Sequence, residues 1–263
     1  MNKKETTVIV QRIEKWYKKL PELVVYNKKL FEAEFAWSKD AVSFDDRLSL
    51  DYVDIKEGGN WAKKWESAWF HLKGSIPGSF KGKTLAAELD FSGEGLVFSP
   101  SGEIMQGITN AAIWDPNFVR TRVPLKPNCL KNGEVELWVE AAANSLFGVF
   151  TEEDPTQESP KRHGWFDAKV EKMKFGIFDK EVWNLYLDAR ILIGLMKKID
   201  EKSVRRSRII LALNNCINQF SGNRENTQKA RECLKKELQK PAAPSDLSVS
   251  AVGHAHIDTG WLW

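Results

Sequence analysis

The stretch EVELWVEA (134–141) alternates apolar and polar side chains from one residue to the next. Successive side chains of a β-strand point to opposite faces, so its two valines and its leucine would share one face, opposite the three glutamates. The same period of two recurs in AWFHLKGSI (68–76) and TLAAELDF (84–91). These runs predict half-buried strands.

Short turn signals separate the predicted strands. They are pairs of residues that contain glycine: Gly58-Gly59, Pro77-Gly78, Lys81-Gly82, Ser101-Gly102 and Asn132-Gly133. Several short strands at this spacing predict a jelly-roll-like β-sandwich, which we assign to residues 31–178. Inside it, the polar stretch TEEDPTQESPKRHG (151–164) is expected to be an exposed loop.

Helical spacing appears on both sides of the sandwich. Residues 5–20 repeat apolar positions at close to the helical period, so we expect residues 1–30 to form an amphipathic helix and a lead-in. After the sandwich, residues 179–240 predict a helical linker segment. Asp179 and Ser203 are the candidate N-caps of its first two helices.

The end of the chain follows a break in the helical pattern. A third helix is expected over 223–240, and the two prolines of PAAPSD (241–246) end it. The apolar run LSVSAVGHAHID (247–258) predicts a buried strand by its length and β-branched content. We therefore expect 241–263 to be a connector and the first strand of an α/β barrel that lies beyond this sequence.

The composition excludes several classes of protein. Net charge is +3, from 39 basic and 36 acidic residues, which indicates neither nucleic acid nor a membrane surface as partner. The N-terminus is too charged for a secretory signal. The three cysteines have no CxxC spacing, which is typical of a reducing compartment, so we expect a cytoplasmic protein. The sequence leaves a homo-oligomer open.

Chemistry-bearing residues concentrate in AVGHAHIDTGWLW (251–263). In an extended strand, His254, His256 and Asp258 would project from one face. Imidazole and carboxylate groups suit a divalent ion such as zinc, although an HxHxD spacing also arises by chance and leaves a zinc sphere unfilled. Trp261 could offer a flat apolar face to a sugar ring.

The terminal motif resembles a known enzyme family. GHAHIDTGWLW (253–263) is similar to the first-strand motif of the family 38 glycoside hydrolases, the class II α-mannosidases. FKGKTLAAELDFSGEGLVFSPSGEIMQGIT (80–109) resembles the N-terminal domain of the cytosolic and vacuolar branch, and SLFGVF (145–150) is a weaker match. The resemblance covers roughly residues 60–263.

The resemblance implies a role for each residue of the motif. His256 and Asp258 would be two ligands of a catalytic zinc, and Trp261 would pack against the mannose ring. His254 would stand behind the ligands without binding the metal. The implied reaction is retaining hydrolysis of terminal α-linked mannose from oligosaccharides, through a covalent intermediate. The nucleophile and the general acid/base would follow residue 263, so these residues alone are expected to be inactive.

An alternative from a different class is a non-catalytic module that binds carbohydrate or assembles subunits. Trp69, Trp114 and Trp138 could bind sugar if they are exposed on the sandwich. Strand alternation places Trp69 and Trp138 opposite the more aliphatic face. We favour packing against the helices or the missing barrel over sugar binding.

Three weaker patterns have structural interpretations. Gly93-Glu94-Gly95 lacks the third glycine of a phosphate loop and predicts a hairpin turn. Glu88, Asp90 and Glu94 are expected on the outer face of a strand and its turn. The arginines at 205, 206 and 208 are expected on a solvent-facing or subunit-facing edge of a helix.

Overall fold

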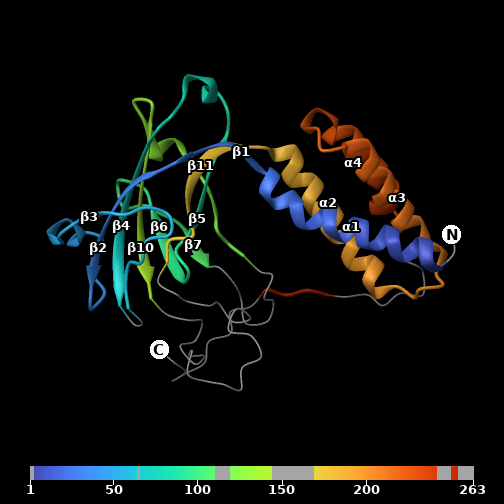
Figure 1. Cartoon of the computed structure of the whole chain (residues 1–263), viewed down its shortest axis with the longest axis horizontal. Coiled ribbons are helices and arrows are strands. Elements are labelled where there is room, and N and C mark those ends of the chain that lie inside the picture. Colours follow the sequence, from blue (N-terminus) through green and yellow to red (C-terminus); the bar gives the residue numbers. More distant parts are fainter. Residues whose placement is uncertain (1–2, 64–65, 110–118, 144–168, 242–249, 254–263) are drawn as a thin grey trace, which may run out of the picture. The chain divides into compact units, whose positions relative to one another are not determined.

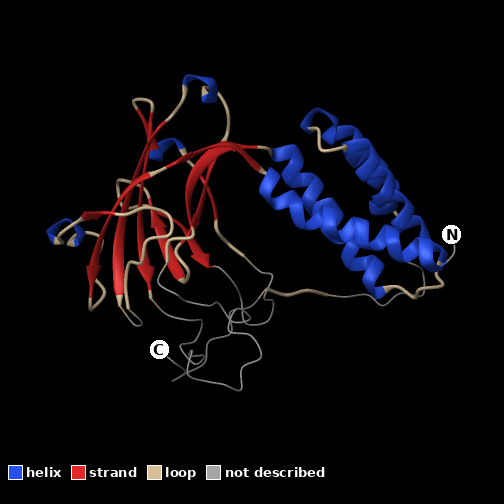
Figure 2. Cartoon of the chain, viewed as in Figure 1, coloured by secondary structure: helices blue, strands red, loops and turns tan. Residues whose placement is uncertain are grey.

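The computed structural model describes residues 3–63, 66–109, 119–143, 169–241 and 250–253. The chain divides into two compact units. One unit is Val25–Phe178, and the other combines Met1–Val24 with Asp179–Trp263. Figure 2 shows that strands build the first unit and helices the second.

The strand unit consists of two antiparallel sheets (Figure 1). The four-stranded sheet contains, in spatial order, β1 (Val25–Leu30), β11 (Lys172–Phe178), β5 (Leu85–Asp90) and β8 (Arg122–Pro124). The seven-stranded sheet contains, in spatial order, β3 (Val53–Asp54), β2 (Glu32–Ser38), β4 (Ser67–Ser75), β10 (Glu134–Ala142), β6 (Glu94–Phe98) and β7 (Ile104–Thr109), and β9 (Leu130–Lys131) pairs with β10. The predicted β-sandwich followed by a helical segment is confirmed.

The period-two stretches form strands β10, β4 and β5. In β10, Val135, Leu137 and Val139 are fully buried between the sheets, as the alternation predicts. The ladder between β10 and β4 pairs Leu137 with Leu72, so aliphatic side chains of neighbouring strands meet on the same face. Cross-strand pairs of this kind stabilise a sheet.

The two sheets enclose an aromatic core. The ring centroids of Phe70 and Phe91 are 4.3 Å apart, and those of Trp61 and Phe70 are 5.5 Å apart. The buried indole Nε1 of Trp61 donates a hydrogen bond to the Phe91 carbonyl (3.0 Å), which satisfies its polar atom. Opposite Gly74, the Phe175 ring approaches so closely that a Cβ there would lie 2.4 Å from Cε1. The sheets therefore need glycine at position 74.

Two predicted turns have different outcomes. Asn132 and Gly133 have φ values of 54° and 80° and join β9 to β10, as expected for an Asn-Gly hairpin. The hairpin predicted at Gly93-Glu94-Gly95 is wrong. Glu94 and Gly95 are the first residues of β6, and residues 91–93 connect β5 to β6, which belong to different sheets.

The helical unit consists of α1 (Lys3–Leu23), α2 (Lys180–Lys198), α3 (Val204–Phe220) and α4 (Thr227–Leu238). Both predicted N-caps are confirmed. Asp179 Oδ1 accepts hydrogen bonds from the amides of Glu181 (3.1 Å) and Val182 (3.0 Å), and Ser203 Oγ accepts one from Arg205 (3.2 Å). The expected third helix begins as a short 3-10 turn, Arg224–Asn226, before α4.

Helix α1 shares a core with α2 and α3, although the sequence analysis placed it in a separate segment. Ile13 and Leu20 are fully buried in the same cluster as the apolar faces of the later helices. Arg12 on α1 donates hydrogen bonds to Asn214 (2.6 Å) and Asn218 (2.8 Å) on α3. The same segment 1–30 also contains β1, which is an edge strand of the four-stranded sheet.

Most of the predicted terminal strand lies outside the described residues, so it stays a prediction. Of residues 247–258, the structure describes 250–253, and these four are exposed and belong to no strand. A strand with this apolar run is stable only when neighbouring strands cover it, and none does so in the described part of the chain.

Within the described residues, no helix has the length and apolar character needed to cross a membrane.

Candidate functional site

The residues of the predicted metal site lie outside the described part of the chain. His254, His256, Asp258 and Trp261 all follow Gly253, the last described residue. Their roles therefore stay predictions. Among the residues that are described, no group of three or more histidine, cysteine, aspartate or glutamate side chains could hold a metal ion.

The outer face of the seven-stranded sheet carries the described residues with the most functional chemistry. Strand register places Glu34, His71, Trp138 and Phe98 in one row across β2, β4, β10 and β6. Trp69 lies on the same face, in the next row. Carboxylate, imidazole and indole groups side by side are typical of a carbohydrate site, so the exposure of this face decides its function.

Residues 42–52, here called the strap, cover this face. Trp69 is 1% exposed and Trp138 is 4% exposed. The apolar side chains of the strap pack on them and on Phe98; these are Val42, Phe44, Leu50 and Tyr52. Trp69 Nε1 donates a hydrogen bond to the Val42 carbonyl (2.9 Å). The preference for packing is correct for both tryptophans, but the partner is a loop of the same unit. Trp114 lies outside the described residues.

Arg47 fastens the strap to the sheet. Its guanidinium carbon lies 3.5 Å from the centroid of the Phe44 ring and 4.3 Å from that of Trp138, within cation–π range. The guanidinium also donates to the Phe44 carbonyl, and the Tyr52 hydroxyl donates to the Arg47 carbonyl (3.0 Å). Burial lowers the pKa of Arg47 and raises that of Tyr52 to about 12.

His71 is held between carboxylates and an indole. Its ring stacks on Trp138 with the centroids 3.9 Å apart. His71 Nε2 lies 2.7 Å from Glu136 Oε1, and Nδ1 lies 3.9 Å from Glu34 Oε2. Burial lowers the pKa of His71, and this effect outweighs the opposing hydrogen bond to Glu136. A neutral imidazole donating from Nε2 to Glu136 fits this environment. His71 thus stabilises the outer face.

Glu88 lies on β5 of the four-stranded sheet and is one of the three carboxylates that the sequence placed on the outer face of a strand and its turn. It forms two ion pairs. It is 8% exposed, and its oxygens lie 2.6 Å from Lys28 Nζ and 3.7 Å from Arg122 Nη2. Lys28 belongs to β1 and Arg122 to β8, which are the two edge strands of the four-stranded sheet that contains β5. A buried carboxylate with two cations is a structural group and not half of an acid/base pair.

A groove opens at the edge of the sandwich, where the chain passes from β1 to β2. It has a volume of about 660 Å³. Its apolar lining includes Phe31, Ile55 and Met173, and its charged residues are Glu32, Asp54, Lys56 and Glu57. Glu57 is fixed, because it accepts from the Met173 amide (2.9 Å) and pairs with Lys174 (3.1 Å).

Trp37 is an exposed aromatic residue that no sequence pattern singled out. It is 51% exposed, near the end of β2. Trp37 follows Phe35 by two residues, so strand alternation assigns both side chains to the face that points into the core. Nothing in the sequence indicates that β2 extends past the edge of that core.

Comparisons with known proteins identify relatives along most of the chain. A family model described as the jelly roll domain of α-mannosidase matches residues 31–172. α-Mannosidase G of Dictyostelium discoideum is 29% identical over 226 residues, which cover 85% of this chain and 20% of that protein.

Two further relatives have similar names. α-Mannosidase 2C1 of Mus musculus is 24% identical over 226 residues, 85% of this chain and 21% of its own length. An α-mannosidase of Saccharomyces cerevisiae is 23% identical over 239 residues, 86% of this chain and 21% of its own length. The chain thus spans about a fifth of the length of the curated relatives it matches.

Proposed function

The chain belongs to the α-mannosidase family that carries this jelly roll domain, and from that premise we propose that it is the N-terminal region of a retaining, zinc-dependent α-mannosidase. The match over residues 31–172 carries the proposal. The named relatives and the terminal motif support it. The proposed substrate is an oligosaccharide with terminal α-linked mannose, and the proposed location is the cytoplasm.

The donor types of the terminal motif fit zinc. His256 offers an imidazole and Asp258 a carboxylate, and zinc accepts both. Two donors leave about half of a sphere of roughly four to be filled by other groups. Zinc, when bound, would hold sugar hydroxyls and help to fix the distortion of the ring. Trp261 would orient the mannose by packing against it, and His254 would position His256 and Asp258.

The proposal assigns no nucleophile and no general acid/base to residues 1–263. The 263 residues alone should therefore bind little or no aryl α-mannoside productively and should not hydrolyse it. In the whole enzyme, the sandwich and the helices would support the catalytic domain. An expressed 263-residue chain that cleaved the substrate would contradict this assignment.

The test uses the full-length protein and 4-nitrophenyl α-mannoside. Asp258→Asn and His256→Ala should each lower kcat/KM at least about 100-fold, because the first replaces a charged carboxylate ligand with a neutral amide and the second removes an imidazole donor. His254→Gln is the matched variant in the same motif, and a loss of about tenfold is expected for it. Chelation should abolish turnover, and added zinc should restore it. Undiminished hydrolysis by the double variant of Asp258 and His256 would refute the metal assignment.

A further inference from the structure

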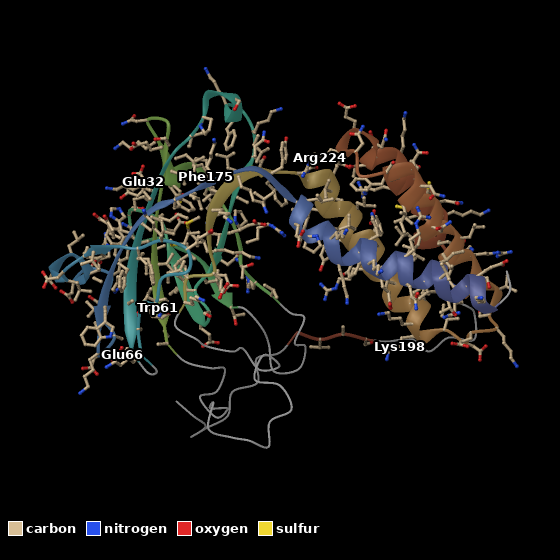
Figure 3. All side chains as sticks on the ribbon, viewed as in Figure 1. Glu32, Trp61, Glu66, Phe175, Lys198 and Arg224 are labelled. Carbon is tan, nitrogen blue, oxygen red and sulfur yellow. The ribbon has the colours of Figure 1, made fainter. Side chains whose placement is uncertain are left out.

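Trp37 lies at one end of the sandwich. In β2, Ala33 and Phe35 pack in the core between the sheets, and Trp37 follows on the same face. Its register partner is Ala68 at the start of β4. Figure 1 shows β2 pointing toward this end of the unit, and Figure 3 labels Glu66, just before β4, at the same end.

A single carboxylate fixes the orientation of the Trp37 ring. Trp37 Nε1 donates a hydrogen bond to Glu66 Oε2 (2.5 Å). The same oxygen accepts the backbone amide of Lys63 (2.6 Å), and the Glu66 carbonyl accepts the amide of Ala143 (2.8 Å). Both the carboxylate and its backbone are therefore held in place. An exposed side chain that is already ordered loses little conformational entropy when a ligand binds.

Trp37 differs from the other tryptophans in the described part of the chain. Trp61, Trp69 and Trp138 are at most 4% exposed, and Trp16 and Trp183 are partly buried in or beside helical packing. Trp37 is the one exposed tryptophan of this part. Its N–H is satisfied within the protein, so the ring can contribute to recognition only through its faces.

The chemistry of this pair fits a sugar. A pyranose ring has a face of C–H groups with partial positive charge, which are attracted to the electron-rich face of an indole. Its hydroxyls need acceptors at the edge of that ring. In the described part of the structure no hydrogen bond uses Glu66 Oε1, and a carboxylate that accepts from a hydroxyl makes a short, strong bond.

We propose that Trp37 and Glu66 form a subsite that stacks and hydrogen-bonds a hexose unit of a mannose-containing oligosaccharide. The subsite itself rests on the geometry of Trp37 and Glu66. The choice of mannose rests on the proposed function. In the whole enzyme, such a subsite would hold a sugar unit other than the one whose bond is cleaved.

The direct test follows the indole N–H signals of the 263-residue chain by ¹H–¹⁵N NMR. Trp37→Phe identifies the Trp37 signal by its disappearance. Adding mannotriose should shift that signal and leave the signals of Trp61, Trp69 and Trp138 in place. Glycerol at equal hydroxyl concentration is the control and should shift none of them. No movement of the Trp37 signal at tens of millimolar mannotriose, or an equal shift with glycerol, would overturn the proposal.

Variants separate stacking from folding. Trp37→Ala should weaken mannotriose binding at least tenfold, followed on backbone amide signals near Ala68, and Trp37→Phe should weaken it less because a smaller ring remains. Leu48→Ala removes another exposed apolar side chain, 69% exposed and on the strap, and should leave binding unchanged. All three should melt within about 2 °C of the parent chain. Parent-like binding by Trp37→Ala would overturn the proposal.

The full-length protein distinguishes failure of this proposal from failure of the proposed function. Hydrolysis of 4-nitrophenyl α-mannoside, which carries one sugar unit, should depend on Asp258, and Trp37→Ala should change its kcat/KM less than that of a mannose oligosaccharide. The same variant should raise KM for a mannose oligosaccharide. Absence of any hydrolysis contradicts the enzyme assignment alone, whereas an unchanged oligosaccharide KM contradicts the subsite alone.

Discussion

The two faces of the seven-stranded sheet are both covered, but by different chemistry. The inner face meets the second sheet through aliphatic and aromatic side chains such as Phe70 and Leu137, which are fully buried. The outer face meets the strap through directional contacts: the Arg47 guanidinium lies over the Trp138 ring, and Trp69 Nε1 donates a hydrogen bond to the Val42 carbonyl. Apolar burial tolerates many sequences, whereas the outer face depends on a few directional contacts.

Removal of Phe70 should have the largest effect. Phe70→Ala leaves a cavity between Trp61 and Phe91, and it should lower the free energy of unfolding by about 3–5 kcal/mol. Urea denaturation of the 263-residue chain measures this loss. The matched variant on the strap, Leu48→Ala, should change the free energy by no more than about 0.5 kcal/mol. Equal effects of the two variants would show that the inner face is not the main core.

Arg47 should have a smaller and more local effect. Arg47→Ala removes two cation–π contacts and a hydrogen bond to the Phe44 carbonyl, so we expect a loss of about 2 kcal/mol. Chymotrypsin should then cleave at Phe44 or Leu48 sooner than in the parent chain. Arg47→Lys keeps the charge but not the planar stack, so it should restore only part of the protection. Full protection in Arg47→Ala would show that the apolar side chains alone hold the strap.

His71 should add a pH dependence, the smallest of the three effects. Burial holds the pKa of His71 below its ordinary value of 6.5, so the unfolded chain binds more protons at mildly acidic pH. Stability should therefore fall as the pH drops below about 6.5, and the loss should level off below the folded-state pKa.

The control for this prediction is His71→Gln, which can still donate a hydrogen bond toward Glu136 but does not titrate. Urea midpoints of both chains between pH 8 and pH 5 give the comparison. The parent chain should lose more stability over this range than the variant does. Parallel curves would mean that His71 does not contribute to the acid sensitivity of the outer face.

The strands and helix caps could be predicted because each depends on local rules. Alternation placed Val135, Leu137 and Val139 on the core face, and the side-chain chemistry of Asp179 and Ser203 marked two helix starts. The hairpin predicted at Gly93-Glu94-Gly95 was wrong, because a glycine turn has the same signature whether it joins strands of one sheet or of two. Helix α1 likewise carries no local sign of the helices it packs against.

The candidate sites show the same limit. Trp37 and Trp138 look alike in sequence, since both occur in alternating strands, yet one is 51% exposed and the other 4%. The difference arises from residues distant in the chain. The strap covers Trp138, whereas Trp37 remains exposed and is oriented by its hydrogen bond to Glu66. Exposure is a property of the assembled surface, so no local pattern reports it.

The sequence by itself determined that β4, β5 and β10 form strands with one apolar face each, that helices follow the sandwich, and that the chain resembles the α-mannosidases. Side-chain period and capping chemistry act over a few residues, so they can be read along the chain. Only the tertiary structure decided that the strap closes the outer face, that α1 joins the later helices, and that Trp37 stays open. Each of these features depends on contacts between segments that are distant in the sequence. Such contacts form only when folding brings the segments together, so no local pattern reports them.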